Sequence, residues 1–114
     1  MTVNVLGTDY TIERRNEKED PKLASGMDAY CDTSVKRIVV SSPECEDVTR
    51  KEDLEYYAKE CTRHEIVHAF LFESGLDGNT GQLNAGWATN EEMIDWIAIQ
   101  SPKLFKAFEQ AGCM

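Results

Sequence analysis

The chain lacks long apolar runs, paired cysteines and an excess of basic charge, and each absence excludes a class of protein. No stretch approaches the roughly 20 apolar residues that span a bilayer, and the N-terminus has neither the basic nor the apolar region of a secretory signal. The four cysteines form no C-x-x-C pair, so we expect reduced and mostly buried thiols. For a complete chain, these absences predict a cytoplasmic protein that makes no contact with membranes.

Basic residues are outnumbered by acidic ones, which bears on the partners of the chain. The formal net charge is −9, and no basic stripe interleaved with aromatic residues offsets it. Such a surface would repel a phosphate backbone, so we expect no direct binding to nucleic acid. The length of 114 residues, with 41% hydrophobic and 29% charged residues, predicts a single globular domain over residues 1–114. The composition does not indicate an oligomeric state.

Histidine is scarce as well, and both copies belong to one motif, His64-Glu65-Ile66-Val67-His68. Positions i and i+4 lie on the same face of a helix, so His64 and His68 can bind one divalent ion while Glu65 reaches a water bound to it. A zinc ion with an open coordination position and an adjacent base turns water into a nucleophile near neutral pH. The pattern H-E-x-x-H is the signature of zinc-dependent peptidases. The simpler alternative is a pair of solvated or core histidines on an amphipathic helix.

The absence of a third histidine excludes the peptidases that take all three ligands from the longer pattern H-E-x-x-H-x-x-G-x-x-H. The third ligand should then be a carboxylate or a thiolate from elsewhere in the chain. Cys61 lies on the same helical stripe as the histidines, but it precedes His68 by two turns, or about 10 Å along the axis. Because one ion cannot contact both, we expect Cys61 to be a packing residue.

Hydrophobic periodicity and turn signals predict an α+β domain. Alternating apolar residues over positions 3–12 predict a β-hairpin with its turn at residues 6–9. A second pair of strands is expected at residues 25–31 and 36–41, where Ile38-Val39-Val40 is the most β-prone run. We expect these strands to form a short antiparallel sheet packed on the helix that carries the motif.

Capping signals delimit the helices. A long active-site helix is expected over about residues 50–74, with Thr49 as the N-cap of a capping box. C-terminal helices are expected over about residues 90–111, with Thr89 as the N-cap and an interruption or bend at Ser101-Pro102. The motif then lies in the second half of the long helix.

Three acids near the start of the C-terminal helices are candidates for the third ligand: Glu91, Glu92 and Asp95. Glu91 and Asp95 are spaced i, i+4 and share one helix face. If Thr89 is the N-cap, Glu92 can bond back to the cap N–H, which leaves Glu91 to bind metal and Asp95 to accept a histidine N–H. The alternative is that these carboxylates only favour the helix N-terminus. The choice between Glu91 and Glu92 stays open.

These residues resemble those of a known group of peptidases. H-E-x-x-H followed by Asn90-Glu91-x-x-x-Asp95 is similar to the thermolysin-type zincins with a glutamate third ligand. In size the chain resembles the small ImmA/IrrE-like metallopeptidases of phages and mobile elements, whose later helix bears an E-x-E-A-[ND]-x-F-A stretch. Residues 91–98 match its first Glu, its acid at the fifth position and its final Ala, but Met93 replaces the second Glu. The resemblance covers roughly residues 35–100 and implies a zincin-like fold and a phage-related role.

The sequence thus predicts a zinc metallopeptidase that acts on protein or peptide substrates, with Zn2+ held by His64, His68 and Glu91 and with Glu65 as general base. One alternative is a zinc-stabilised regulatory or protein-binding module on a zincin scaffold with little peptidase activity. The intact Glu65 argues against it, because a structural zinc needs no base. A metal-free helical interaction domain would require both histidines to be coincidental.

Two further expectations concern the substrate. A second electrophile for the oxyanion is not visible in the motif, and Tyr10 or Tyr30 could supply it only if the fold brings one of them close. The strand ending at Ser41 is a candidate to pair with an extended substrate by strand addition.

Overall fold

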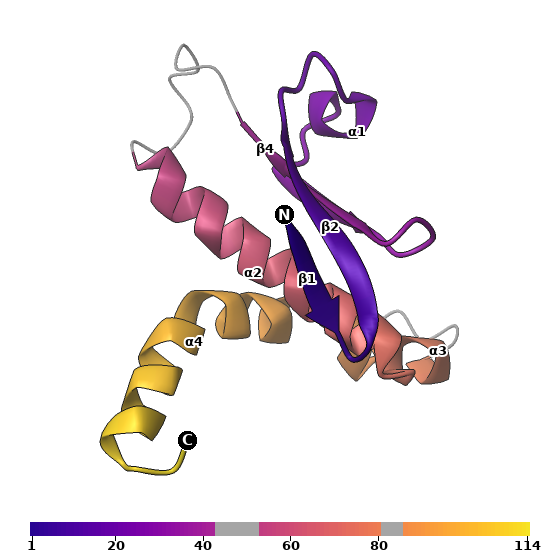
Figure 1. The fold of residues 1–114 in the computed structure, drawn as a ribbon. Helices are drawn as coiled ribbons and strands as arrows, with labels where there is room; N and C mark the ends of the chain where they lie inside the picture. The colour runs from indigo at the N-terminus through magenta and orange to yellow at the C-terminus, as the bar shows by residue number, and fades with distance from the viewer. Residues whose placement is uncertain (43–52, 81–85) are drawn as a thin grey trace.

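The structure of the chain, a computed structural model, describes residues 1–42, 53–80 and 86–114. Within these residues one four-stranded sheet and four α-helices are present, so the expected α+β class is confirmed. Helix α2 (Leu54–Glu73) lies between the sheet and the first half of α4 (Glu91–Gln110), as Figure 1 shows. None of the described helices is long and apolar enough to cross a membrane.

The predicted hairpin is formed by β1 (Thr2–Val5) and β2 (Thr8–Arg15). Its two turn residues, Leu6 and Gly7, have φ angles of 52° and 93°. Two successive positive φ angles are characteristic of type I′ turns, whose twist matches that of the flanking strands. The alternation then directs Tyr10 into the core, where it is completely buried.

The expectation of an antiparallel sheet is wrong for one pair of strands. β4 (Arg37–Ser41) pairs antiparallel with β3 (Ala29–Asp32) but parallel with β2, because the chain turns back through α1 (Pro21–Ala24) before the β3–β4 hairpin begins. The sheet is therefore mixed, in the order β1-β2-β4-β3. The run Ile38-Val39-Val40 is buried on both faces, which suits a strand in the middle of a sheet.

This strand order decides which strands lie in the middle of the described sheet and which lie at its edges. β4 is paired on both sides, by β2 and by β3, so the expectation that the strand ending at Ser41 receives a substrate is wrong. Among the described residues the edge strands are β1 and β3, and β3 packs against α2.

Helix α2 begins later than expected, after Asp53, whose side chain accepts a hydrogen bond from the Tyr56 N–H at 3.0 Å. The predicted cap, Thr49, lies outside the described residues. The helix ends before Gly75, whose φ of 86° is the left-handed conformation common after helix C-termini. The short helices α3 (Leu76–Thr80) and η1 (Trp87–Thr89) follow.

The C-terminal segment is one helix rather than two. α4 continues through Pro102, although Figure 1 shows that it changes direction along its length. A proline has no N–H, so the carbonyl four residues earlier, that of Ala98, loses its helix partner. Arg63 of α2 donates from Nε to this carbonyl at 2.5 Å. A side chain of the neighbouring helix thus satisfies the carbonyl and ties α4 to α2.

The start of α4 also differs from the expectation. Its N-cap is Asn90, whose Oδ1 accepts a hydrogen bond from the Met93 N–H at 2.9 Å, whereas Thr89 closes η1. The third helical position is then Met93, so the capping-box role expected for Glu92 is wrong. Glu91 becomes the first residue of the helix.

Two apolar clusters hold α2 in place between its neighbours. The sheet side is formed by six buried residues, Val5, Tyr10, Ile38, Val40, Ala58 and Ala69. On the other side Leu71 of α2 packs with Ala88 of η1 and Ile94 of α4. This second cluster brings the first turn of α4 beside the motif on α2.

Candidate metal centre

Two imidazoles and a carboxylate meet where the start of α4 packs against α2. His64 Nε2 and His68 Nε2 are 3.1 Å apart. The carboxylate of Glu91 reaches both rings: its Oε2 lies 3.0 Å from His64 Nε2, and its Oε1 lies 3.2 Å from His68 Nε2. Zinc binds nitrogen and oxygen at about 2.0–2.2 Å, which sets two ligand atoms of a tetrahedral ion about 3.3 Å apart. The donor atoms and their spacing therefore fit one zinc ion.

Asp95 contacts the other side of the first imidazole. Its Oδ1 lies 2.6 Å from His64 Nδ1, and on α4 it follows Glu91 by one turn. A carboxylate at Nδ1 keeps the proton on that nitrogen and leaves the lone pair of Nε2 directed to the cluster. The structure thus places Asp95 where its predicted role requires it, and the role itself stays a prediction.

Of the two glutamates left open by the sequence, Glu91 lies within reach of both histidines. Over the part of the chain that the structure describes, the ion pairs of His64 and His68 involve Glu91 and Asp95 and do not involve Glu92. His64, His68 and Glu91 form the group whose ligand atoms all lie within 4.8 Å of one another. That these three residues bind a metal is still a prediction.

Glu65 is buried beside the cluster, with 8% of its surface exposed. Its pKa is raised to about 7, mainly because burial disfavours the charged carboxylate; the charge of Glu91 adds to the shift and His64 opposes it. A carboxyl group with such a pKa can accept and return a proton near neutral pH. Burial also lowers the pKa of His68, which favours the neutral ring that metal binding requires.

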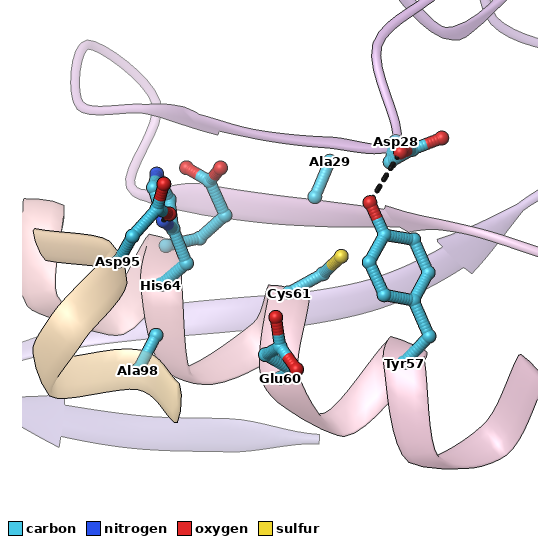
Figure 2. A pocket seen from close by; sticks show the side chains of 9 residues that line it. Asp28, Ala29, Tyr57, Glu60, Cys61, His64, Asp95 and Ala98 are labelled. Carbon is cyan, nitrogen blue, oxygen red and sulfur yellow. Dashed lines mark hydrogen bonds and ion pairs between the residues drawn. The ribbon is translucent and has the colours of Figure 1, made fainter. Parts of the chain in front are cut away.

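Two cavities adjoin the cluster, and Glu65 lines both. The smaller, of about 190 Å³, extends from His64 along α2 to Tyr57 and is shown in Figure 2. The larger, of about 400 Å³, contains both histidines and Glu91. Ala29 of the edge strand β3 also lines both cavities. The candidate site therefore lies in a groove between α2 and the edge strand β3 of the described sheet.

Neither candidate tyrosine is available as a second electrophile. The Tyr10 hydroxyl donates to Glu73 Oε1 at 2.7 Å, and the Tyr30 hydroxyl donates to Asp20 Oδ2 at 2.5 Å. Both hydroxyls are thus engaged by carboxylates that do not belong to the cluster. Tyr30 lines the larger cavity together with the histidines, but its hydroxyl is directed to Asp20.

Two cysteines, Cys31 and Cys61, lie near the site. Cys61 packs against the core cluster, as predicted. Cys31 lines the larger cavity, but burial raises its pKa to about 12, so it stays protonated at neutral pH. Among the described residues, the group whose ligand atoms lie close enough to share an ion is His64, His68 and Glu91, so its donors are nitrogen and oxygen.

Sequence reasoning missed the cavity residues outside the motif. Glu60 precedes His64 by one helical turn, so helical spacing alone could have identified it. Asp28 and Ala29 come from the segment that leads into β3, and no local pattern indicates that this strand forms the edge of the sheet.

Comparison with known proteins adds no relative to this description. No family model matches the chain, and neither the curated proteins nor the solved structures include a match. The features of the chain that bear on its function are therefore the α+β fold and the cluster of His64, His68 and Glu91.

Proposed function

We propose that the chain is a zinc-dependent metallopeptidase of zincin-like fold, with His64, His68 and Glu91 as ligands and Glu65 as general base. The main support is the position of Glu65, which follows the first ligand, is buried, and lines the cavities on both sides of the cluster. Structural zinc sites use four protein ligands and no base, whereas the described residues bring together three candidate ligands. This difference favours a catalytic site over a regulatory zinc module.

Each residue of the proposed site has its own role in the reaction. A zinc ion, when bound, supplies a Lewis acid for the peptide carbonyl and lowers the pKa of water toward about 7. Glu65 accepts the proton of the attacking water and passes it to the leaving amine. Asp95 holds His64 in the tautomer that directs Nε2 to the cluster. Glu65 is buried except where it lines the two cavities, so its carboxyl group can be reached from the groove.

The proposed substrate is an extended segment of a peptide or protein. Residues of β3 form one wall of the groove and α2 with Glu65 forms the other. An edge strand has unpaired backbone N–H and C=O groups, so an extended peptide can add to it by main-chain hydrogen bonds. Such a peptide would pass directly over the cluster.

The substitution Glu65→Gln tests this function, because it removes the base and keeps the shape of the side chain. Wild type is expected to contain one zinc by elemental analysis and to cleave a mixture of unfolded proteins or peptides. Glu65→Gln is expected to keep its zinc and to lose at least about 100-fold in rate. The matched control is Glu109→Gln, the same change at an exposed position near the end of α4, which should leave the rate unchanged.

The other outcomes distinguish the alternatives. Equal cleavage by wild type and Glu65→Gln would remove Glu65 from catalysis. Zinc bound by a wild type that hydrolyses no substrate would favour the regulatory module. A protein that binds no zinc would support a metal-free interaction domain.

A further inference from the structure

The smaller cavity combines apolar walls with several carboxylates. Its volume is about 190 Å³, and its apolar lining comes from Ala29, Tyr57, Cys61 and Ala98. The remaining lining, apart from His64, is acidic: Asp28, Glu60, Glu65 and Asp95. Among the described residues that line it, none is lysine or arginine. A side chain with an aliphatic stem and a cationic end matches both parts of this lining.

The four carboxylates that line the smaller cavity differ in their hydrogen-bond partners. Asp95 faces His64 Nδ1, and Asp28 accepts a hydrogen bond from the Tyr57 hydroxyl at 2.5 Å. For Glu60 we find no hydrogen bond or ion pair within residues 1–42, 53–80 and 86–114. Glu65 is more than nine-tenths buried and likewise has no hydrogen-bond partner in these ranges. Within the described part of the chain, no donor binds Glu60 or Glu65.

The acidic groups extend beyond the reach of a metal ion at the cluster. Figure 2 shows Asp28 and Tyr57 at the end of the cavity away from His64 and Asp95, with Glu60 between the two ends. A bound divalent ion would offset the charges of the acids nearest to it. The charge of Glu60 would remain for a ligand.

The direction of β3 indicates which residue of a substrate enters this cavity. The smaller cavity adjoins the start of β3, at Asp28 and Ala29, whereas the larger one extends to Cys31 and Thr33. Antiparallel pairing is the more stable arrangement per residue. An antiparallel peptide would run from the larger cavity, over Glu65, toward the smaller one. The residue that follows the cleaved bond then meets Glu60.

From this geometry we infer that the smaller cavity selects a lysine or arginine side chain immediately after the cleaved bond, with Glu60 as the specificity-determining residue. The inference rests on the proposed function, since the cavity adjoins Glu65. It adds a substrate class to that function: peptides with a basic residue at this position.

The test measures binding apart from cleavage. Fluorescent alanine-based hexapeptides that differ at one position (lysine, arginine, norleucine or glutamate) are titrated with zinc-supplemented Glu65→Gln protein, and binding is followed by fluorescence anisotropy. Norleucine has the stem of lysine without its charge, so the comparison isolates the cation. We expect the lysine and arginine peptides to bind about fivefold more tightly than the norleucine peptide at low salt. The preference should shrink as ionic strength rises.

The role of Glu60 is tested by adding Glu60→Gln to the same protein. The preference for lysine should fall to about twofold or less, while Glu109→Gln, which removes one charge far along α4, should leave it unchanged. Equal binding of the lysine and norleucine peptides would overturn the inference. So would a preference that survives Glu60→Gln in full.

Cleavage by wild type separates this inference from the proposed function. Cleavage of a peptide mixture without preference for a basic residue after the broken bond would refute the inference. The proposal that the chain is a peptidase would then still be supported. A preference in binding, with no cleavage by wild type, would support the assigned cavity and refute the peptidase.

Discussion

Removal of the Asp95 carboxylate should weaken zinc binding without removing a ligand. Asp95 Oδ1 lies 2.6 Å from His64 Nδ1, the distance of a strong, charge-assisted hydrogen bond. Such bonds contribute up to about 3 kcal/mol when they are shielded from water. The Asp95 side chain is 61% exposed, so solvent screening reduces this contribution to about 1.4 kcal/mol. Asp95→Ala should therefore raise the Kd for zinc about tenfold.

The substitution Asp95→Asn separates the charge from the hydrogen bond. The amide oxygen of asparagine can still accept the Nδ1–H of His64, so the orientation of the ring is preserved while the charge is lost. We expect a smaller increase of the Kd, of about threefold. A loss as large as that of Asp95→Ala would mean that charge alone accounts for the effect.

The assay is competition for zinc between the metal-free protein and a chromophoric chelator at pH 7. Glu92→Ala is the matched control, because it removes the same charge from the same end of α4 at a residue that does not contact the described histidine side chains. The Kd of this control should stay within about twofold of wild type. A Kd of Asp95→Ala within the same range would refute the reasoning, as would equal weakening by Asp95→Ala and Glu92→Ala.

Two further predictions concern the third ligand and the acid stability of the fold. Glu91→Ala should lose most of its zinc on dialysis whereas Glu92→Ala should retain it, as elemental analysis can show; the opposite result would make Glu92 the ligand. The pKa of Asp20 is lowered to about 2, first by the hydrogen bond from Tyr30 and also by those from Arg15 and backbone N–H groups. Since its unfolded value is about 3.9, the charged form contributes stability that is complete above about pH 4 and is lost as the pH falls through about 2. Asp20→Asn should therefore lower the free energy of unfolding more at pH 6 than at pH 2 in urea titrations with a chelator present, and equal losses at both values would contradict this assignment.

Local sequence patterns do not by themselves decide where the helices of this chain begin and end. Thr89 with Glu92 and Asn90 with Met93 are both acceptable starts for a helix by local rules, and the structure uses the second. The 3-10 turn of η1 and the packing of Ala88 against Ile94 and Leu71 place the chain so that Asn90 becomes the cap. The course of α4 at Pro102 is likewise decided by a distant contact. Arg63 of α2 donates to the carbonyl of Ala98, and the helix continues past the proline.

The sequence by itself determined the hairpin, the long helix and the spacing of His64, Glu65 and His68, because turns and helices follow from hydrogen bonds between near neighbours. Only the tertiary structure decided that β4 is central, that β3 lies at an edge of the described sheet, and that Glu91 rather than Glu92 faces the two imidazoles. These features depend on contacts between segments far apart in the chain, and no local pattern of residues specifies such contacts.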